Sequence, residues 1–383
     1  GDVYKRQALG ILGVLPSKQV YAGLSNSTVV LFGGMFVIGA AMFRTGLAQA
    51  IGVAVVKKAG TNEVPLMGAV MLVTIVLSSV SSNTGTVACL MPVIIGICQA
   101  AKIAPSRQLM PLAIAANVGG TITMIGTPPN VIVTGALSAA GLPTFGFFEF
   151  AYIGIPLSII VFFFTLFIGR HLLPKNDIGE MDEEALKEAA EEAGAGGDDE
   201  PKSTTKMWIS GLIMIGVVIC MALDLKTLPL QTAAVTGAIL CVITGCLKEK
   251  EAYAGIDWVT IFLFAGMLSV ATAMEKTGAG KLIADAVVGS MGEHPNAVVL
   301  CAVLYLISNV LTQFMSNTAA AALLAPIGIS IAQSIGADPK PVLMAIGIAA
   351  SMAFATPMAT PPNTLVLGPG GFTFNDYCLL YTS

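Results

Sequence analysis

The chain has 383 residues, of which 55% are hydrophobic and only 11% are charged. Ordinary globular proteins carry about 25% charged residues, so this composition excludes a typical soluble domain and indicates a helical protein that crosses the lipid bilayer several times. A membrane β-barrel would instead show alternating segments of about ten residues, and the modest formal net charge of −4 indicates no nucleic-acid partner.

The two ends look foreign to the rest of the chain. Residues 2–7 read Asp-Val-Tyr-Lys-Arg-Gln and can be encoded by GATGTGTATAAGAGACAG. The reverse complement of that DNA, read one base in, encodes Cys-Leu-Leu-Tyr-Thr-Ser, which is residues 378–383. We therefore expect residues 1–7 and 378–383 to be non-native tails derived from one sequencing adapter, with the natural protein continuing past both ends.

The first half of the chain, residues 8–172, is a run of apolar segments. They cover residues 8–15 (the stump of a membrane helix), 28–43 with an amphipathic continuation to 56, 65–77, 86–100, 109–125, 131–140 and 148–169. The pieces 65–77 and 86–100 flank Ser82-Asn83-Thr84 and are each shorter than the roughly 20 residues needed to span a bilayer, so we expect a re-entrant hairpin. The pieces 109–125 and 131–140 flank Gly126-Thr127-Pro128-Pro129-Asn130, and they predict one transmembrane helix with an unwound centre.

Residues 173–206 form the only long polar segment, and its acidic composition predicts a cytoplasmic surface helix followed by a flexible linker. The second half, residues 207–377, then repeats the organisation of the first. It has spans over 207–223, 229–246 and 258–274, a hairpin over 297–311 and 319–334 around Ser316-Asn317-Thr318, and a broken helix over 341–355 and 364–368 around Ala359-Thr360-Pro361-Pro362-Asn363.

The motifs recur in a nearly constant register. Tyr21-Ala22-Gly23 returns 232 residues later, the Ser-Asn-Thr motif 234 residues later and the Thr-Pro-Pro-Asn motif 233 residues later. Duplicated halves in a hydrophobic chain are the usual build of a secondary transporter. Four crossings separate the two broken helices, so the second broken helix enters the membrane from the opposite side. We therefore expect an all-α polytopic membrane protein built from inverted-topology repeats.

Lysine and arginine predict the orientation. Eleven of these residues fall on the side of the linker and the first hairpin, against five on the other side. This excess places the linker and the first hairpin in the cytoplasm. We expect a multi-pass integral protein of the bacterial cytoplasmic (inner) membrane.

The Ser-Asn-Thr motifs have a physical use. These residues are strong N-caps, so the second half-helix of each hairpin is expected to start there. The exposed N–H groups and the positive end of the helix dipole then favour an anion in the membrane interior. The preceding half-helix leaves carbonyl oxygens without partners, and together with the side-chain oxygens these suit Na⁺.

The Thr-Pro-Pro-Asn motifs complement them. Two prolines remove two N–H donors and interrupt the helix, which is expected to leave the carbonyl of Gly126 or Ala359 free. Unwound backbone at membrane depth is tolerated only where it is buried or lines a cavity. A plain proline kink or a few packing serines would explain one motif alone, but two different interruptions that each occur twice favour a binding site.

The hairpins and broken helices contain no Asp, Glu or His. A proton-coupled carrier usually needs an intramembrane titratable group, so the sequence favours Na⁺ coupling, or plain exchange, over H⁺ coupling. An intramembrane enzyme would need a nucleophile with a base or a metal cluster, and an ion channel would need a continuous pore. We therefore expect a transporter with no organic cofactor, not an enzyme.

At these motifs the chain resembles the divalent anion/sodium symporter family of carboxylate and sulfate carriers, from about Tyr21 to Tyr377. The resemblance implies an inverted-repeat fold and a homodimer, with a scaffold domain and a mobile transport domain that moves elevator-fashion. Full members have further spanning helices, so the resemblance also implies that helices are missing before residue 8 and after residue 377.

The resemblance assigns roles to individual residues. It implies a first Na⁺ site formed by Ser78, Ser82, Asn83 and the backbone of Gly126. A second Na⁺ site would use Thr312, Asn317 and the backbone of Met315 and Ala359. The substrate anion would lie between the hairpin tips and touch Asn83, Thr84, Asn317 and Thr318, with Thr127, Thr360 and Pro361 alongside.

The leading hypothesis is Na⁺-coupled symport of a small divalent anion, a di- or tricarboxylate, by elevator-type alternating access. The runner-up is Na⁺-independent anion exchange (dicarboxylate/citrate antiport), or sulfate symport, on the same fold. Helix N-termini, hydroxyls and amides can hold dicarboxylate, citrate and sulfate alike, so the sequence leaves the substrate open.

Overall fold

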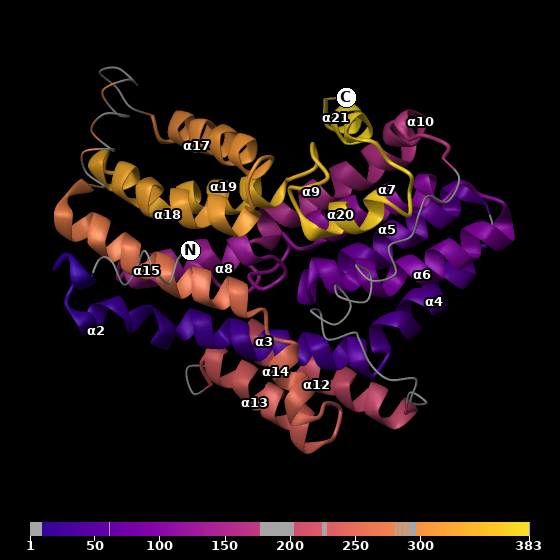
Figure 1. Ribbon diagram of the computed structural model, residues 1–383, viewed down its shortest axis with the longest axis horizontal. Helices are drawn as coiled ribbons and strands as arrows, with labels where there is room; N and C mark the ends of the chain where they lie inside the picture. The colour runs from indigo at the N-terminus through magenta and orange to yellow at the C-terminus, as the bar shows by residue number, and fades with distance from the viewer. Residues whose placement is uncertain are drawn as a thin grey trace.

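The computed structural model describes residues 10–60, 62–176, 203–223, 228–279 and 296–382, with residues 282, 285 and 289 between the last two ranges. These residues form helices and loops without a strand (Figure 1). Five helices are long and apolar enough to cross a membrane: Ser27–Arg44, Glu63–Val80, Asn83–Ala101, Ala151–Leu172 and Thr204–Ala222. The prediction of an all-α polytopic membrane protein is confirmed, whereas the predicted tail 1–7 and most of the acidic linker lie outside the described residues.

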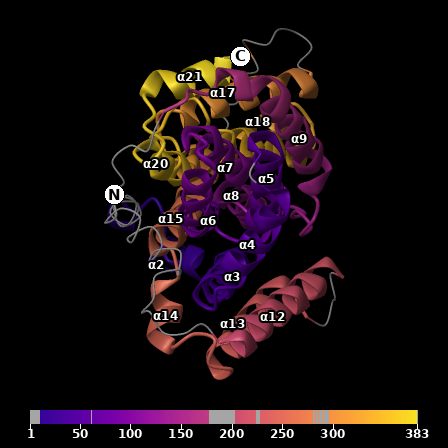
Figure 2. The same ribbon diagram turned by 90° about the vertical axis from the view of Figure 1, so that its right-hand side faces the viewer.

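One layer of the fold is built around α3 (Ser27–Arg44). α3 packs along α13 (Leu230–Ile243) and also contacts α12 (Thr204–Ala222) and α14 (Glu249–Ala254). Figure 2 shows α12 and α13 on the far side of α3 from the remaining helices. We call α3, α12, α13 and α14 the outer layer.

The larger body of the fold contains both predicted hairpins and both broken helices. Its first half consists of α5 (Glu63–Val80), α6 (Asn83–Ala101), α7 (Ser106–Gly119), α8 (Pro128–Ala139) and α9 (Ala151–Phe164), which continues through η2 (Thr165–Gly169) into α10 (Arg170–Leu172). Its second half consists of α17 (Ala297–Thr312), α18 (Asn317–Ser334), α19 (Pro339–Ser351), α20 (Pro361–Leu367) and α21 (Phe374–Thr382). The halves interlock, because α18 and α19 pack on α8 while α20 packs on α6 and α7.

Two helices connect the larger body, called the inner body from here on, to the outer layer. α4 (Leu47–Ala59) follows α3 and packs on α5, α6 and α12. α15 (Trp258–Thr277) contacts α3 together with α8 and α18, and it also covers the short helix η1 (Ala22–Ser25), which follows α2 (Ser17–Val20). The sequence predicted that residues 28–56 continue as one helical stretch, but the chain turns at Gly46, whose φ of 82° suits glycine.

The helices of the first hairpin are longer than the sequence predicted. α5 has 18 residues and α6 has 19, and both are long and apolar enough to cross a membrane. α5 continues through Ser78 and Ser79, whose hydroxyls donate to the carbonyls of Ala116 and Val76. The prediction that both pieces are too short to span was therefore wrong, and the re-entrant course of the hairpin stays a prediction.

The helix breaks lie earlier than predicted. α7 ends at Gly119 and not at residue 125, and α8 begins at Pro128 and not at residue 131. α20 likewise begins at Pro361. Proline fits the first position of a helix, where its missing N–H has no intrahelical partner to lose, so each Pro-Pro pair starts the second piece.

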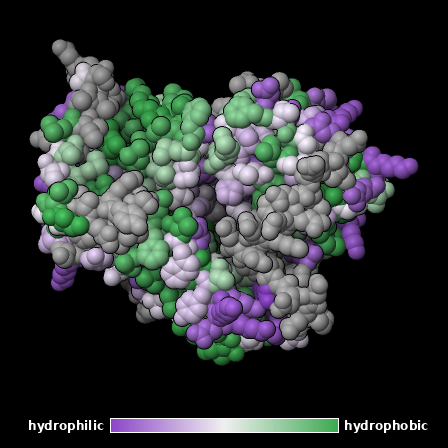
Figure 3. All heavy atoms as spheres, viewed as in Figure 1, coloured by the Kyte–Doolittle hydropathy of each residue, from purple (hydrophilic) through white to green (hydrophobic). Residues whose placement is uncertain are grey.

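Apolar side chains face outward over much of the surface. Along α9 and α17, Tyr152 is 80% exposed, Val298 74% and Leu306 63%. Figure 3 shows hydrophobic atoms gathered where α17 lies, and hydrophilic atoms at the right-hand edge of the view and at its lower end. A soluble surface does not carry so many large exposed apolar groups together, whereas a lipid-facing surface does.

Candidate functional site

Each hairpin tip starts a helix inside the body, as the sequence predicted. Ser82 caps α6 and Ser316 caps α18, and each side-chain oxygen accepts a hydrogen bond of 3.3 Å, from the Gly85 and Ala319 N–H groups respectively. Asn83 and Asn317 are therefore the first residues of helices whose N-terminal N–H groups are directed at the space before them.

The two Thr-Pro-Pro-Asn motifs share one local structure. Thr127 and Thr360 precede the prolines in extended conformation, with φ of −142° and −140°. The side-chain amide of Asn130 donates to the Thr123 carbonyl at 2.9 Å, and that of Asn363 donates to the Thr356 carbonyl at 3.0 Å. The asparagine of each motif thus closes the non-helical loop before it.

Four oxygen atoms meet at the first tip. The Ser78 hydroxyl lies 2.5 Å from Asn83 Oδ1 and donates to the Ala116 carbonyl at 2.8 Å. The same Asn83 oxygen lies 3.2 Å from the Ala116 carbonyl oxygen and 3.0 Å from that of Gly126. A Cβ at Gly120 would lie 2.6 Å from this oxygen, so glycine leaves the room that the cluster occupies.

The second tip repeats this cluster atom for atom. The Thr312 hydroxyl lies 2.8 Å from Asn317 Oδ1 and donates to the Ala350 carbonyl at 2.7 Å. Asn317 Oδ1 lies 3.2 Å from the Ala350 carbonyl oxygen and 3.1 Å from that of Ala359. The predicted ligands Ser78, Asn83 and Gly126 are therefore brought together, and so are Thr312, Asn317 and Ala359.

Oxygen atoms that face one another in this way can be satisfied by two arrangements. A cation between them would be coordinated by all four, as hard oxygen ligands coordinate Na⁺. Alternatively each carboxamide can rotate by half a turn, which directs its NH₂ at the same oxygens and satisfies it without an ion. The residues present therefore fit a cation and also have a neutral arrangement.

Both tips and both breaks line one cavity of about 550 Å³. Its predicted members are Ser82, Asn83, Thr84, Gly126, Thr127, Asn317, Thr318, Ala359, Thr360 and Pro361. Ser78 and Thr312 are fully buried behind Asn83 and Asn317, and Met315 packs against the neighbouring apolar cluster. The opposite wall comes from α3 and the start of α15 and is mostly apolar, including Phe32, Phe36 and Trp258.

The sequence did not single out two polar residues of the cavity lining. Asn117 is only 1% exposed, and its amide donates to Thr360 Oγ1 at 3.2 Å and to Asn363 Oδ1 at 3.1 Å. Asp257 caps α15 by accepting from the Thr260 N–H at 3.0 Å and from the Thr260 hydroxyl. Among the described residues that line the cavity, Asp257 carries the only formal charge.

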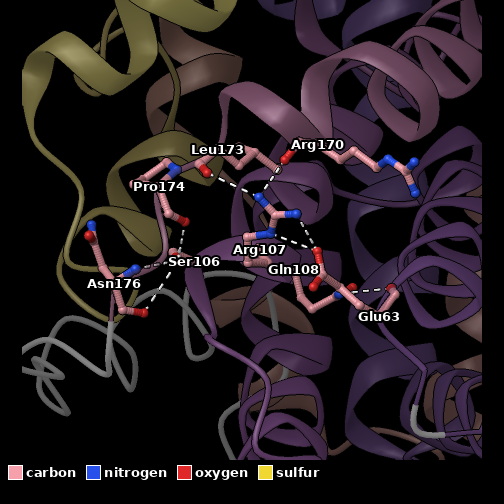
Figure 4. Close-up of polar contacts among 8 residues, drawn as sticks. All are labelled: Glu63, Ser106, Arg107, Gln108, Arg170, Leu173, Pro174 and Asn176. Carbon is pink, nitrogen blue, oxygen red and sulfur yellow. Dashed lines mark hydrogen bonds and ion pairs between the residues drawn. The ribbon is translucent and has the colours of Figure 1, made fainter.

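A second polar cluster lies at the start of α7 (Figure 4). Arg107 pairs with Glu63 at 2.5 Å and also donates to the carbonyls of Arg170 and Leu173. The neighbouring Ser106 hydroxyl donates to the Pro174 carbonyl at 2.7 Å. The cluster fastens the segment after α10 to α5 and α7. The sequence offers no local sign of the Arg107 partner, since Glu63 lies 44 residues away.

Comparison with known proteins places the chain among transporters. The model of the citrate transporter family, CitMHS, matches residues 7–339. A Haemophilus influenzae protein described as an uncharacterized transporter is 30% identical, and the match covers 96% of this chain and 82% of that protein. The sodium-dependent dicarboxylate transporter SdcS of Staphylococcus saprophyticus is 25% identical, and the match covers 93% of this chain and 73% of SdcS.

The fold also has a relative among solved structures. The crystal structure of the YdaH transporter of Alcanivorax borkumensis superimposes with a TM-score of 0.63. The match covers 96% of this chain and 84% of that one at 16% sequence identity, so the likeness concerns the fold alone.

Proposed function

Because the chain belongs to the citrate transporter family, which is related to the divalent anion/sodium symporters, we propose that it is a sodium-coupled symporter of a small di- or tricarboxylate. Its family and relatives are transporters, so the chain is an integral membrane transporter and not an enzyme. The observation that carries the proposal is the repetition, at Asn83 and at Asn317, of a side-chain amide, a hydroxyl and two backbone carbonyls gathered at a hairpin tip.

The cavity has the chemistry of an anion site. The N-termini of α6 and α18 open onto it, and helix N-termini supply N–H donors and positive potential. The hydroxyls of Thr84, Thr127, Thr318 and Thr360 add further donors. No Lys, Arg or His is among the described lining residues, so a bound cation is the natural partner for the charge of a dianion.

The two oxygen clusters supply a place for that cation. The first site in the proposal uses Ser78, Ser82, Asn83 and the Gly126 carbonyl, and the second uses Thr312, Asn317 and the carbonyls of Met315 and Ala359. Short contacts between unprotonated oxygens are unfavourable in the absence of a cation or a donor. The repetition of these contacts at both tips supports two Na⁺ sites.

Asn83 and Asn317 link the two kinds of ligand. Each belongs to an oxygen cluster and also lines the cavity. A Na⁺ ion bound by the side-chain oxygen holds the amide so that its NH₂ is directed away from the cluster, where an anion can accept from it. Binding of either ion then favours binding of the other, and this mutual effect couples their transport.

The arrangement of the helices supports alternating access. The inner body contributes both tips and both breaks to the cavity, while α3 and the start of α15 form the opposite wall. In an elevator-type mechanism the inner body would carry the bound ions past the wall that α3 and α15 form. An inverted relation of the repeats, a homodimeric assembly and a place in the bacterial cytoplasmic membrane complete the proposal.

The neutral arrangement of the clusters favours one alternative. If the Asn83 and Asn317 amides donate to the carbonyl oxygens, the cavity can bind an anion without sodium. The same fold would then perform sodium-independent exchange of dicarboxylate or citrate, or carry sulfate.

The deciding experiment is uptake of labelled succinate, citrate and sulfate into proteoliposomes, with and without an inward Na⁺ gradient. We expect succinate or citrate uptake that requires Na⁺. Uptake that proceeds equally well in K⁺ medium with counter-anion inside would establish exchange and overturn the symport proposal. Uptake of sulfate alone would overturn the carboxylate assignment.

A further inference from the structure

We propose that Asn117 is a positioning residue that turns the Thr360 hydroxyl toward the substrate, and that its counterpart in the second repeat, Ser351, orients Thr127 much more weakly. The inference rests on the proposed function and deepens it, because it makes the two halves of the anion site unequal. It concerns a residue on α7 that touches neither predicted Na⁺ cluster through its side-chain hydrogen bonds.

The orientation of the Asn117 amide is fixed by its neighbours. Asn363 uses its own NH₂ on the carbonyls of Ala353, at 2.8 Å, and Thr356, at 3.0 Å. Asn363 Oδ1 therefore faces Asn117 as an acceptor, 3.1 Å away, and only the Asn117 NH₂ can satisfy it. The second hydrogen of the same NH₂ then points to Thr360 Oγ1 at 3.2 Å.

This contact decides which way the Thr360 hydroxyl points. A hydroxyl that accepts a hydrogen bond from an amide must direct its own hydrogen elsewhere. The Thr360 side chain makes no capping hydrogen bond to α20, and it lines the cavity. Its hydrogen is thus available to an anion in the cavity, which needs donors and repels acceptors.

The equivalent contact in the other half is weaker. Ser351, 234 residues after Asn117, lies on α19 with its hydroxyl oxygen 3.4 Å from Thr127 Oγ1. The single Ser351 hydrogen already goes to the Gly347 carbonyl at 3.0 Å. The Ser351 hydroxyl therefore donates to Thr127 Oγ1 only through a long contact that competes with Gly347, which orients the Thr127 hydroxyl less firmly than Asn117 orients that of Thr360.

Asn117 also has a buried polar atom that packing alone does not explain. Its Oδ1 is buried and has no hydrogen-bond partner among the described residues. An unpaired buried acceptor lowers the free energy of unfolding, so a residue chosen only for packing would not leave one. The half of the amide that has partners is its NH₂, which donates to Thr360 and Asn363.

The test is a double-mutant cycle read by anion uptake in proteoliposomes. Asn117→Ser copies the residue of the other repeat and removes the donor to Thr360, and Thr360→Val removes the hydroxyl that Asn117 orients. We expect Asn117→Ser to raise the KM for the transported carboxylate about five- to tenfold with little change in kcat, the factor for one lost hydrogen bond. In the Thr360→Val background the same change should raise KM less than about twofold.

Two further variants separate positioning from packing. Asn117→Asp keeps the shape but can only accept, so it should draw the Thr360 hydrogen away from the cavity and impair uptake more than Asn117→Ser does. Ser351→Ala should change KM far less than Asn117→Ser. Equal effects of Asn117→Ser in both backgrounds, or an Asn117→Asp variant with wild-type KM, would overturn the inference.

A failure of the proposed function has a different signature. If the wild-type protein takes up none of the tested anions, the transport assignment fails. Thermal unfolding in detergent then tests the inferred contact on the four proteins of the cycle, which are the wild type, Asn117→Ser, Thr360→Val and the double variant. Non-additive shifts of the unfolding midpoint support the Asn117–Thr360 hydrogen bond, and additive shifts exclude it.

Discussion

The side-chain amide of Asn83 lies 3.0 Å from the carbonyl oxygen of Gly126, which accepts a hydrogen bond when the NH₂ of the amide faces it. Asn317 and Ala359 repeat the relationship at 3.1 Å. Each contact joins a hairpin tip to a broken helix. Whatever occupies the space around these oxygens therefore holds the two motifs of one half of the chain together.

The first prediction concerns the two asparagines. Asn83→Ala and Asn317→Ala should each abolish uptake while leaving membrane insertion intact, because each change removes a ligand shared by cation and anion. Uptake by proteoliposomes and the yield of folded protein in the membrane fraction measure the two effects. Asn62→Ala is the matched control, since Asn62 is an exposed cap residue whose side chain makes no capping hydrogen bond.

The aspartate variants at the same positions distinguish the two arrangements of the clusters. Asn83→Asp keeps an oxygen for a cation but has no NH₂ to offer the carbonyl oxygens. If Na⁺ binds there, the variant should retain Na⁺ binding in a scintillation proximity assay with ²²Na⁺. Loss of Na⁺ binding by Asn83→Asp and Asn317→Asp alike would contradict the cation sites.

The second prediction concerns the hydroxyls behind the tips. Ser78→Ala and Thr312→Val should raise the Na⁺ concentration needed for half-maximal uptake about five- to tenfold, because each removes one oxygen ligand or hydrogen bond. The maximal rate at saturating Na⁺ should change little. Thr74→Val is the control on the same helix as Ser78, since the Thr74 hydroxyl bonds only to the Val70 carbonyl within α5. An equal shift in the control would speak against a role for Ser78.

The third prediction concerns the charge on the cavity wall. Asp257→Asn should lower the KM for a dianion about two- to fivefold, because it removes a negative charge that repels the substrate across the cavity. Asparagine caps helices as well as aspartate does, so α15 should keep its start. The gain should shrink at high ionic strength, where charges are screened. Glu249→Gln, an exposed change outside the cavity, should leave KM unaltered.

The fourth prediction concerns the Arg107 cluster. Arg107→Met should reduce the free energy of unfolding by about 2–3 kcal/mol, because it leaves the half-buried Glu63 carboxylate and two carbonyls without their donor. The midpoint of thermal unfolding in detergent, at a fixed scan rate, measures the loss. Lys340→Met is the matched comparison, since Lys340 opens the corresponding helix α19 and pairs with Glu149, but its side chain is 24% exposed against 11% for Arg107. A loss as large at Lys340 would show that burial of the cation is not the cause.

The sequence predicted the parts of the site that repeat and missed those that depend on distant partners. Ser82 and Ser316 were recognisable as caps because capping is a local property, and the structure confirms that they cap α6 and α18. The Pro-Pro pairs were placed in the breaks, although proline also starts helices, and α8 and α20 begin there. The lone Asn117 has no local signal, because its partners Thr360 and Asn363 are more than two hundred residues away.

Because α8 and α20 begin with Pro-Pro pairs, the backbone at their starts differs from the backbone at the hairpin tips in the N–H groups that it can offer to the cavity. At the hairpin tips the opening turns of α6 and α18 present N–H groups, whereas at the breaks the first two positions have none to present. Under the proposed function, main-chain atoms that no side-chain substitution removes would sort positive from negative ligands. Substitutions at Thr84, Thr318 or Asp257 would then change the substrate range and leave the separation of cation from anion intact.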